Sequence, residues 1–338
     1  MTALSTHARP RLLATGVPTP DVLQRAEKEF DLKVWHGSDP IGERLIEEVT
    51  GFDALLVMPG DKLDASMIQR LPQSVKAIAT HSVGFDHVDV SAATRRGLPV
   101  FNTPDVLTEA VADLAMFLLL AAARDTTSAE ASLREGRWGR WAPNHYLGRS
   151  LNVMRLGIFG MGRIGQAVAK RAAAFGMELH YHNRSRLPTE REMGSAFHET
   201  LEDLLPSSDV LCVCAPSTPA LRHSLDARRL ALLPRGAIVV NIARGDLIDE
   251  PALFEAVHAG QVSAVGIDVF QGEPTIDKRW MELPNSTLLP HIGSATREVR
   301  NAMGMLALDG LRSHFAGTPA SNLLNPAAYE VASSSAVS

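Results

Sequence analysis

The sequence is poor in cysteine, and the two cysteines that it has are close neighbours. Cys212 and Cys214 are separated only by Val213 and stand in an apolar run. A disulfide within one short backbone segment would be strained, and two thiolates cannot complete a metal site alone. We therefore predict buried, reduced cysteines in a cytoplasmic protein, with no metal.

Long apolar segments and basic clusters are also missing. The longest apolar run, residues 114–123 between Asp113 and Arg124, has about half the length that crosses a bilayer. Residues 1–10 are polar and lack the apolar core of a signal peptide. The formal net charge is −5, and no Lys/Arg cluster is long enough to follow a phosphate backbone. These absences predict a chain that binds neither a membrane nor nucleic acid.

What the sequence does have is a strand–helix alternation that occurs twice. At roughly 100–200 residues per domain, the 338 residues predict two domains. Helical patterns, for instance at residues 20–30 and 64–71, lie between short apolar runs. This alternation is typical of parallel sheets with helices on both faces, so the predicted fold class is α/β with two Rossmann-like units. The predicted strands are residues 11–15, 33–36, 54–58, 76–80 and 99–102, and then 156–159, 178–182, 210–214, 237–242, 264–269 and 287–289.

Four segments lie outside this alternation. A long helix is predicted at about residues 107–124, and an irregular segment at residues 136–148 carries Trp138 and Trp141. A final amphipathic helix is predicted near residues 295–315. Because it follows the second unit, the chain can return there to complete the first domain. The small, polar residues 332–338 predict a disordered tail.

A dinucleotide-binding motif follows the predicted strand at residues 156–159. Its six residues are Gly160, Met161, Gly162, Arg163, Ile164 and Gly165. A lone G-x-G-x-x-G is a weak signal, but here a strand precedes it and an amphipathic helix follows it. Gly160 permits the tight turn, Gly162 lets the backbone approach a pyrophosphate, and Gly165 lets helix and strand pack closely. The helix then offers its free N–H groups to the phosphates.

The end of the next predicted strand indicates which dinucleotide binds. NAD sites place an acidic residue there, roughly 20 residues past the glycines, to bind the ribose hydroxyls. This chain has no carboxylate at that place, and a guanidinium fork and a hydroxyl suit a 2′-phosphate. We predict NADP(H) as the preferred cofactor, with NAD(H) possible; the alternative is that the arginines are solvated surface charges. The residues concerned are Asn183, Arg184, Ser185 and Arg186. His180 and His182 have a metal-like spacing, but no third ligand is evident.

Three polar residues follow predicted strand ends where ligands of open α/β sheets bind. Arg244, Glu273 and His291 come after the strands at residues 237–242, 264–269 and 287–289. Arg244 can bind a substrate carboxylate as a fork, and His291 can exchange a proton with a carbonyl oxygen as hydride reaches the carbon. Glu273 beside His291 would favour the imidazolium. Each alone could be a cap or a surface residue, but together they predict a catalytic site.

Over nearly its whole length the sequence resembles the D-isomer-specific 2-hydroxyacid dehydrogenases. The matching segments are GMGRIG at 160–165, NIARG at 241–245, LIDE at 247–250, GIDVF at 266–270, Glu273-Pro274, and PHIGSAT at 290–296. The turn before the first dinucleotide strand departs from the family, with Val153-Met154 where Gly-Lys is common.

The resemblance implies a set of roles. Arg244, Glu273 and His291 would be the catalytic trio. Residues 82–86, which begin with Ser82, would be the substrate loop and would bind the substrate carboxylate through the N–H groups of Val83 and Gly84. Residues 242–244, with Ile242 and Ala243, and Asp268 would lie along the nicotinamide side of the cofactor. Gly293 and Ser294 would be further cofactor-binding residues.

The resemblance also implies an organisation and an activity. Residues 1–106 and 292–338 would form a substrate-binding domain and residues 107–291 an inserted dinucleotide-binding domain, with a cleft that closes on substrate. Family members are usually dimers, joined through the cofactor domain and the region near residues 125–150. The expected reaction is reduction of a small 2-oxo acid, glyoxylate or hydroxypyruvate first, to the D-2-hydroxy acid. The alternatives are 2-ketogluconate, another 2-oxo acid, a formate or phosphite dehydrogenase, and a dinucleotide-sensing, corepressor-like protein.

Overall fold

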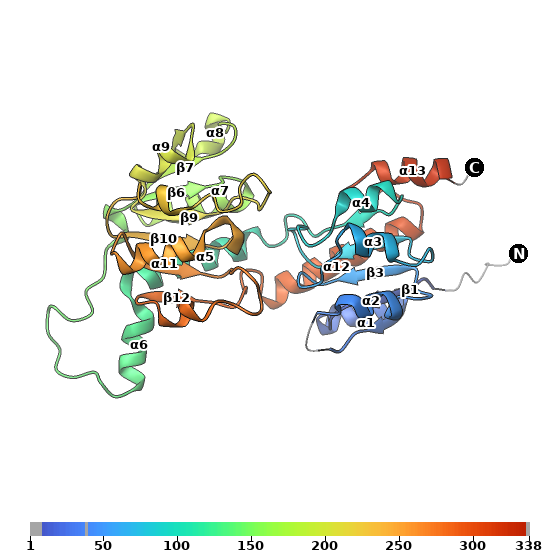
Figure 1. The fold of residues 1–338 in the computed structure, drawn as a ribbon, viewed down its shortest axis with the longest axis horizontal. Helices are drawn as coiled ribbons and strands as arrows, with labels where there is room; N and C mark the ends of the chain where they lie inside the picture. The colour runs from blue at the N-terminus through green and yellow to red at the C-terminus, as the bar shows by residue number, and fades with distance from the viewer. Residues whose placement is uncertain (1–8, 38–39, 336–338) are drawn as a thin grey trace, which may run out of the picture. The chain divides into compact units, whose positions relative to one another are not determined.

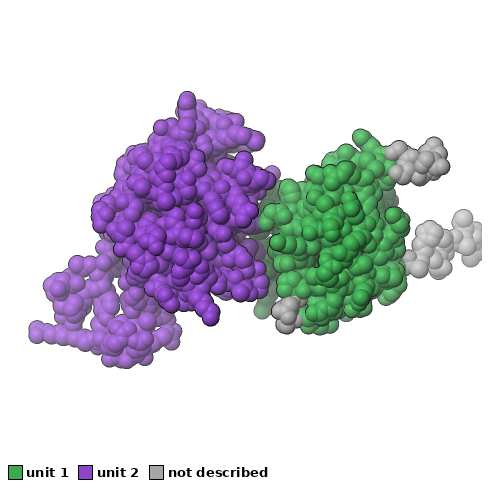
Figure 2. All heavy atoms as spheres, viewed as in Figure 1, with its two compact units in different colours: residues 1–107, 295–338 green, residues 108–294 purple. Residues whose placement is uncertain are grey.

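The computed structural model describes residues 9–37 and 40–335, and the chain forms two compact units. One unit comprises Met1–Leu107 and Ala295–Ser338, and the other Thr108–Ser294 (Figure 2). The chain therefore leaves the first unit, builds the second and returns. Within the described residues, no helix combines the length and hydrophobicity needed to cross a membrane.

The first unit is a five-stranded parallel sheet with strand order β2-β1-β3-β4-β5. Strands β3 and β4 are buried at every position, because helices cover both faces and the strands are continuous apolar runs. The strands are β1 (Arg11–Ala14), β2 (Asp31–Val34), β3 (Ala54–Val57), β4 (Ala77–Thr80) and β5 (Val100–Phe101). The helices are α1 (Pro20–Glu29), α2 (Leu45–Glu48), α3 (Ala65–Arg70), α4 (Val90–Arg95), α12 (Arg297–Phe315) and α13 (Ala327–Ser335).

Two buried asparagines attach the returning chain to this unit. Asn325 accepts a hydrogen bond from the Val100 N–H at 2.8 Å and donates to the Leu98 carbonyl at 3.0 Å. Asn322 donates to the Asn102 carbonyl at 2.8 Å. Figure 1 shows α12, in orange-red, among the blue and cyan elements of the first unit. The C-terminal segment is therefore an integral part of this unit's core.

The prediction of a disordered tail is wrong for residues 332–335, which belong to α13. A Cβ added to Gly97, just after α4, would lie 3.1 Å from the Ala332 nitrogen. Ala332 is small enough to permit this close packing, so a composition that suggests disorder also suits a packed helix. Residues 336–338 lie outside the described part of the chain.

The second unit is a seven-stranded parallel sheet with order β12-β11-β10-β9-β6-β7-β8. The order reverses between β6 and β9, which is the place where open α/β sheets bind ligands. The strands are β6 (Arg155–Phe159), β7 (Glu178–His182), β8 (Ala196–His198), β9 (Val210–Val213), β10 (Ala237–Asn241), β11 (Val262–Ile267) and β12 (Ser286–Leu288). The helices are α5 (Thr108–Arg124), α6 (Thr126–Arg134), α7 (Arg163–Ala174), α8 (Thr189–Glu192), α9 (Leu201–Leu204), α10 (Ala227–Leu230) and α11 (Glu250–His258).

The α/β fold with two parallel sheets is confirmed, with every predicted strand present. Strand β2 begins two positions earlier than predicted, and β11 runs over Val262–Ile267 instead of residues 264–269. Strand β8 was not predicted, because it is a short edge strand with only partly buried side chains.

Candidate functional site

The turn between β6 and α7 has the backbone geometry of a phosphate-binding loop. Gly160 has φ +99°, and a Cβ added there would lie 2.5 Å from the Ala215 nitrogen. A Cβ on Gly165 would lie 2.4 Å from the Gly160 carbonyl oxygen, whereas a Cβ on Gly162 would meet nothing within 4 Å. Gly162 caps α7 without a side-chain hydrogen bond, and the N-terminus of a helix favours an anion. A dinucleotide pyrophosphate fits this place.

The end of β7 lies beside the glycine turn and carries the residues predicted to bind the adenosine ribose. The Met161 N–H donates to the Asn183 side-chain oxygen at 2.6 Å, which joins the turn to the strand end. Arg184, Ser185 and Arg186 are all exposed. The two arginines differ, however, because Arg186 is held in an ion pair and Arg184 makes no hydrogen bond or ion pair with the described residues.

The end of β10 shapes the backbone around Arg244. The Asn241 side chain accepts a hydrogen bond from the Ala243 N–H at 3.0 Å and donates to the Arg244 carbonyl at 2.9 Å. Asn241 is 1% exposed, so this double contact fixes the turn from inside. Sequence reasoning quoted Asn241 within a family motif and gave it no role. A buried amide at the end of an apolar strand was the available signal.

Asp268 holds the chain on either side of His291. Its N–H donates to the Asn241 carbonyl at 3.0 Å, and its carbonyl accepts from the His291 N–H at 2.8 Å. Its carboxylate oxygens accept from the N–H groups of Ile292 and Gly293 at 2.7 and 2.8 Å. Burial raises the pKa of this carboxyl, although these two N–H groups act in the opposite direction. Asp268 therefore ties β10, β11 and the segment after β12 together.

His291 and Glu273 form a hydrogen-bonded pair. The distance between Nδ1 of His291 and Oε2 of Glu273 is 2.7 Å, and the other Glu273 oxygen accepts from the Phe270 N–H at 2.7 Å. Burial alone would raise the pKa of Glu273, but the hydrogen bond and charge of His291, the Phe270 N–H and the Arg244 charge together lower it. Glu273 is therefore an ion that orients the ring. The His291 Nε2 makes no hydrogen bond with the described residues and can exchange a proton with a ligand.

The predicted carboxylate-binding loop belongs to the first unit. The Ser82 hydroxyl donates to the Gly84 carbonyl at 2.7 Å and lies 2.6 Å from the Thr80 hydroxyl, so it supports the loop from inside. Asn102 donates to the Val83 carbonyl at 2.9 Å. The N–H groups of Val83 and Gly84 make no hydrogen bond within the described residues and are half-exposed. They are free to bind an anion.

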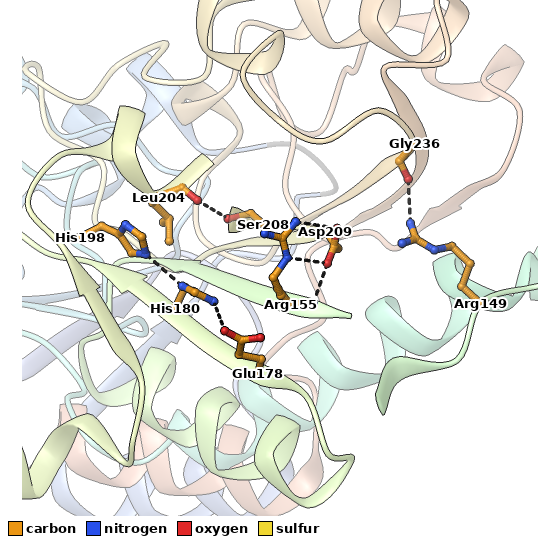
Figure 3. Close-up of polar contacts among 9 residues, drawn as sticks. All are labelled: Arg149, Arg155, Glu178, His180, His198, Leu204, Ser208, Asp209 and Gly236. Atoms are coloured by element: carbon orange, nitrogen blue, oxygen red, sulfur yellow. Dashed lines mark hydrogen bonds and ion pairs between the residues drawn. The ribbon is translucent and has the colours of Figure 1, made fainter. Parts of the chain in front are cut away.

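The opposite, amino edge of the second sheet holds its own polar contacts (Figure 3). Arg155, at the start of β6, pairs with Asp209 at 3.0 Å, and His180 lies 3.0 Å from both His198 and Glu178. The ring nitrogens of His180 are thus both engaged. Among residues 9–37 and 40–335, no three His, Cys, Asp or Glu side chains gather as a metal site would require. Cys212 and Cys214 are free thiols whose sulfurs lie 3.6 Å apart.

Comparison with known proteins identifies the family. Residues 116–293 match the family model described as D-isomer specific 2-hydroxyacid dehydrogenase, NAD binding domain. A glycerate dehydrogenase of Hyphomicrobium methylovorum is 40% identical over 312 residues, covering 91% of this chain and 97% of that protein. A glyoxylate reductase of Thermococcus kodakarensis is 39% identical over 329 residues, covering 96% and 98%.

A solved structure has the same fold at substantial identity. It is an NADPH-dependent glyoxylate/hydroxypyruvate reductase from Sinorhizobium meliloti in complex with NADP and malonate. It is 36% identical to this chain, with a TM-score of 0.83, and the match covers 94% of this chain and 97% of that one.

The lowered pKa of Glu273 predicts a pH dependence of stability. A depressed folded-state pKa stabilises the fold above the unperturbed value of 4.5, and this contribution is lost as the pH falls through the folded-state pKa. In urea unfolding from pH 3 to 7, the free energy of unfolding of wild type minus that of Glu273→Gln should therefore be largest above about pH 5 and shrink below it. In a His291→Ala background the pH dependence of this difference should be weaker. A difference that is constant with pH would contradict stabilisation of Glu273 as an ion.

Proposed function

This chain belongs to the D-isomer specific 2-hydroxyacid dehydrogenase family, and from that premise we propose that it reduces a small 2-oxo acid to the D-2-hydroxy acid with NADP(H). Glyoxylate and hydroxypyruvate are the proposed substrates. The observation that carries the proposal is the 2.7 Å His291–Glu273 pair with the Arg244 charge beside it. This pair lies in the same unit as the glycine turn between β6 and α7, where a Cβ added to Gly162 would meet no atom within 4 Å.

Each member of the trio has a distinct role in this proposal. NADPH, when bound, would supply the hydride that the carbonyl carbon accepts. His291 donates a proton from Nε2 to the carbonyl oxygen, so hydride and proton together complete the reduction. Glu273 holds Nδ1 and so fixes the orientation of the ring. Arg244 binds the carboxylate and the neighbouring carbonyl of the substrate, and the N–H groups of Val83 and Gly84 bind the carboxylate.

The remaining proposed contacts follow the cofactor through the second unit, which we assign as the dinucleotide-binding domain. The first unit is then the substrate-binding domain. Gly162 and the start of α7 bind the pyrophosphate. The 2′-phosphate binds at the end of β7. The proposed cofactor residues are Gly160, Gly162, Arg163, Ile164, Gly165, Asn183, Arg184, Ser185, Arg186, Ile242, Ala243, Asp268, Gly293 and Ser294.

The substrate class is supported by the names of the relatives. Glycerate is the 2-hydroxy acid that corresponds to hydroxypyruvate, and glyoxylate is the smallest 2-oxo acid. Two relatives are named for glycerate and for glyoxylate, and the solved structure is of a reductase for glyoxylate and hydroxypyruvate. The NADPH of that reductase also supports the proposed cofactor.

Variants of the trio test the activity. NADPH oxidation, followed as loss of nicotinamide absorbance, should be fast with glyoxylate or hydroxypyruvate. His291→Ala should lower kcat at least about a hundredfold, because it removes the proton donor. Arg244→Ala should abolish measurable turnover, mainly through lost carboxylate binding. Near-normal rates in either variant would refute the mechanism. Tight NADPH binding without turnover of any 2-oxo acid would favour a dinucleotide sensor.

A charge reversal at the end of β7 tests the cofactor preference. Arg184→Asp should lower kcat/KM for NADPH and move the preference toward NADH, since a carboxylate repels a 2′-phosphate and accepts hydrogen bonds from ribose hydroxyls. Arg191→Asp, at an exposed arginine of the nearby helix α8, is the matched control and should change the preference little. An unchanged NADPH/NADH ratio in Arg184→Asp would show that another group recognises the phosphate.

We further propose that the protein is a homodimer joined through residues 125–150. Figure 1 shows the loop after α6 running away from the sheet of its own unit. Trp138 is 61% exposed and Trp141 and Leu147 are each 75% exposed. Apolar side chains of this size gathered on one segment are typical of an interface. Between α6 and this loop lies an open hollow of about 560 Å³, so the loop is not tightly packed on its own chain.

Sedimentation equilibrium tests the dimer. Wild type should have twice the chain mass of 36.5 kDa, and Trp141→Glu should shift it toward the monomer because a buried unpaired charge opposes association. Met281→Glu is a matched control, since Met281 is 68% exposed in the same unit but lies outside the segment. A monomeric wild type would refute the proposal.

A further inference from the structure

A buried carboxylate lies under the predicted phosphate-binding residues. Glu192, the last residue of α8, is 4% exposed. Its carboxylate accepts hydrogen bonds from Nε and Nη2 of Arg186 at 2.8 and 3.0 Å, and from the Tyr181 hydroxyl at 2.7 Å. The Tyr181 oxygen in turn accepts from the Leu187 N–H at 3.0 Å. The arginine and the tyrosine lower the pKa of Glu192, so it is an ion at neutral pH.

This contact occupies one edge of the Arg186 guanidinium and leaves the other exposed. The carboxylate takes the Nε–Nη2 edge, and a guanidinium has five N–H groups. The remaining three make no hydrogen bond with the described residues, and the Arg186 side chain is 63% exposed. An arginine held in this way still has two parallel N–H groups on its solvent side. Such a pair of donors matches the geometry of a phosphate.

The anchored arginine lies on the segment that joins β7 to α8, next to the glycine turn. Asn183 binds the backbone of that turn, and Arg184 and Ser185 follow it directly. Glu192 can affect the binding of a phosphate there in two opposing ways. It orders the flexible Arg186 side chain before the phosphate binds, which favours binding. It also adds a negative charge behind the guanidinium, which disfavours binding. The ordering cost of an arginine is among the largest of any side chain. The repulsion is offset by the positive charge of the Arg186 guanidinium, which lies between the carboxylate and the phosphate in this proposal. Orientation should therefore prevail.

Resting on the proposed use of NADP(H), we propose that Glu192 is a positioning residue for cofactor selectivity. By holding the Nε–Nη2 edge of Arg186, it presents the remaining N–H groups of Arg186, with Arg184 and Ser185, to the 2′-phosphate of the adenosine ribose. Glu192 itself touches no part of the cofactor in this proposal.

Binding of two adenine nucleotides to the full-length protein isolates this effect. Isothermal titration calorimetry would measure Kd for adenosine 2′,5′-bisphosphate and for AMP, which differ only in the 2′-phosphate. In Glu192→Gln the bisphosphate should bind roughly tenfold more weakly, the loss expected when an arginine must be ordered on binding, and AMP should bind as in wild type. The ratio of kcat/KM for NADPH and NADH should fall in parallel.

Each other outcome overturns the inference in a distinct way. Equal weakening of AMP and bisphosphate would mean that Glu192 only maintains the shape of the loop. Unchanged or tighter bisphosphate binding would mean that Glu192 competes with the phosphate for Arg186. A wild-type protein that binds both nucleotides equally would refute the proposed NADP(H) preference itself, and the inference with it.

Three further variants separate positioning from stability. Arg186→Lys keeps the charge without the fork and leaves the buried carboxylate paired, so it should lose bisphosphate binding like Glu192→Gln even if the latter folds poorly. In an Arg186→Ala background, Glu192→Gln should cause no further loss of selectivity, because it acts through Arg186. Asp209→Asn breaks a similar ion pair at the amino edge of the same sheet (Figure 3). It is the matched control and should leave the nucleotide ratio unchanged.

Discussion

The hydrogen bonds of Asp268 are the interaction on which the site depends most. His291 has φ +53°, in the left-handed region that costs a β-substituted residue energy, and it must nevertheless present its ring in one orientation. The Asp268 carboxylate binds the two N–H groups that follow His291, and its carbonyl binds the His291 N–H. Its own N–H reaches the Asn241 carbonyl of β10. One residue that is 1% exposed thus holds the strained backbone from both sides and connects it to the turn that carries Arg244.

The two edges of the second sheet use charge differently. At the carboxyl edge, Glu273 is stabilised as an ion by a histidine and an arginine that remain half-exposed, so His291 and Arg244 are accessible to a ligand. At the amino edge, Arg155 and Asp209 contact each other through several hydrogen bonds (Figure 3). These hydrogen bonds from Arg155 lower the pKa of Asp209 and engage both oxygens of its carboxylate. In open α/β sheets, ligands bind beyond the carboxyl ends of the strands. We therefore expect reactive groups at the carboxyl edge and structural ion pairs at the amino edge.

Most of the fold could be predicted from the sequence, because strands and helices depend on short-range pattern. The proximity of Arg244, Glu273 and His291 could be predicted as well, because the carboxyl ends of parallel strands share one edge of the sheet. Strands such as β3 and β6 are apolar runs bounded by turns, and the glycine motif carries its own steric logic. Glu192 could not be found this way. Residues 189–192 contain several charged residues, and nothing in the sequence distinguishes Glu192 from the others. Glu192 is buried because the folded chain places α8 against Tyr181. The same contact distinguishes the two arginines, which look equivalent in sequence. Within the part of the chain that the structure describes, Arg186 is paired and Arg184 is not.

Both units contain a parallel sheet of the same kind, but the turns that follow β1 and β6 differ in the room that they leave for a dinucleotide. In the first unit the turn after β1 is filled by its own side chains: the Thr15 hydroxyl bonds to the buried Asp61, and the Met58 N–H donates to Thr15 at 3.0 Å. Helix α1 then begins at Pro20, which has no N–H to offer a phosphate. In the second unit the turn after β6 is lined by glycines, a Cβ on Gly162 would meet open space, and α7 begins without a side-chain cap. A sheet topology of the right kind is therefore not sufficient. The proposed dinucleotide site lies at the helix that follows β6, where Gly162 leaves room beside the helix N-terminus.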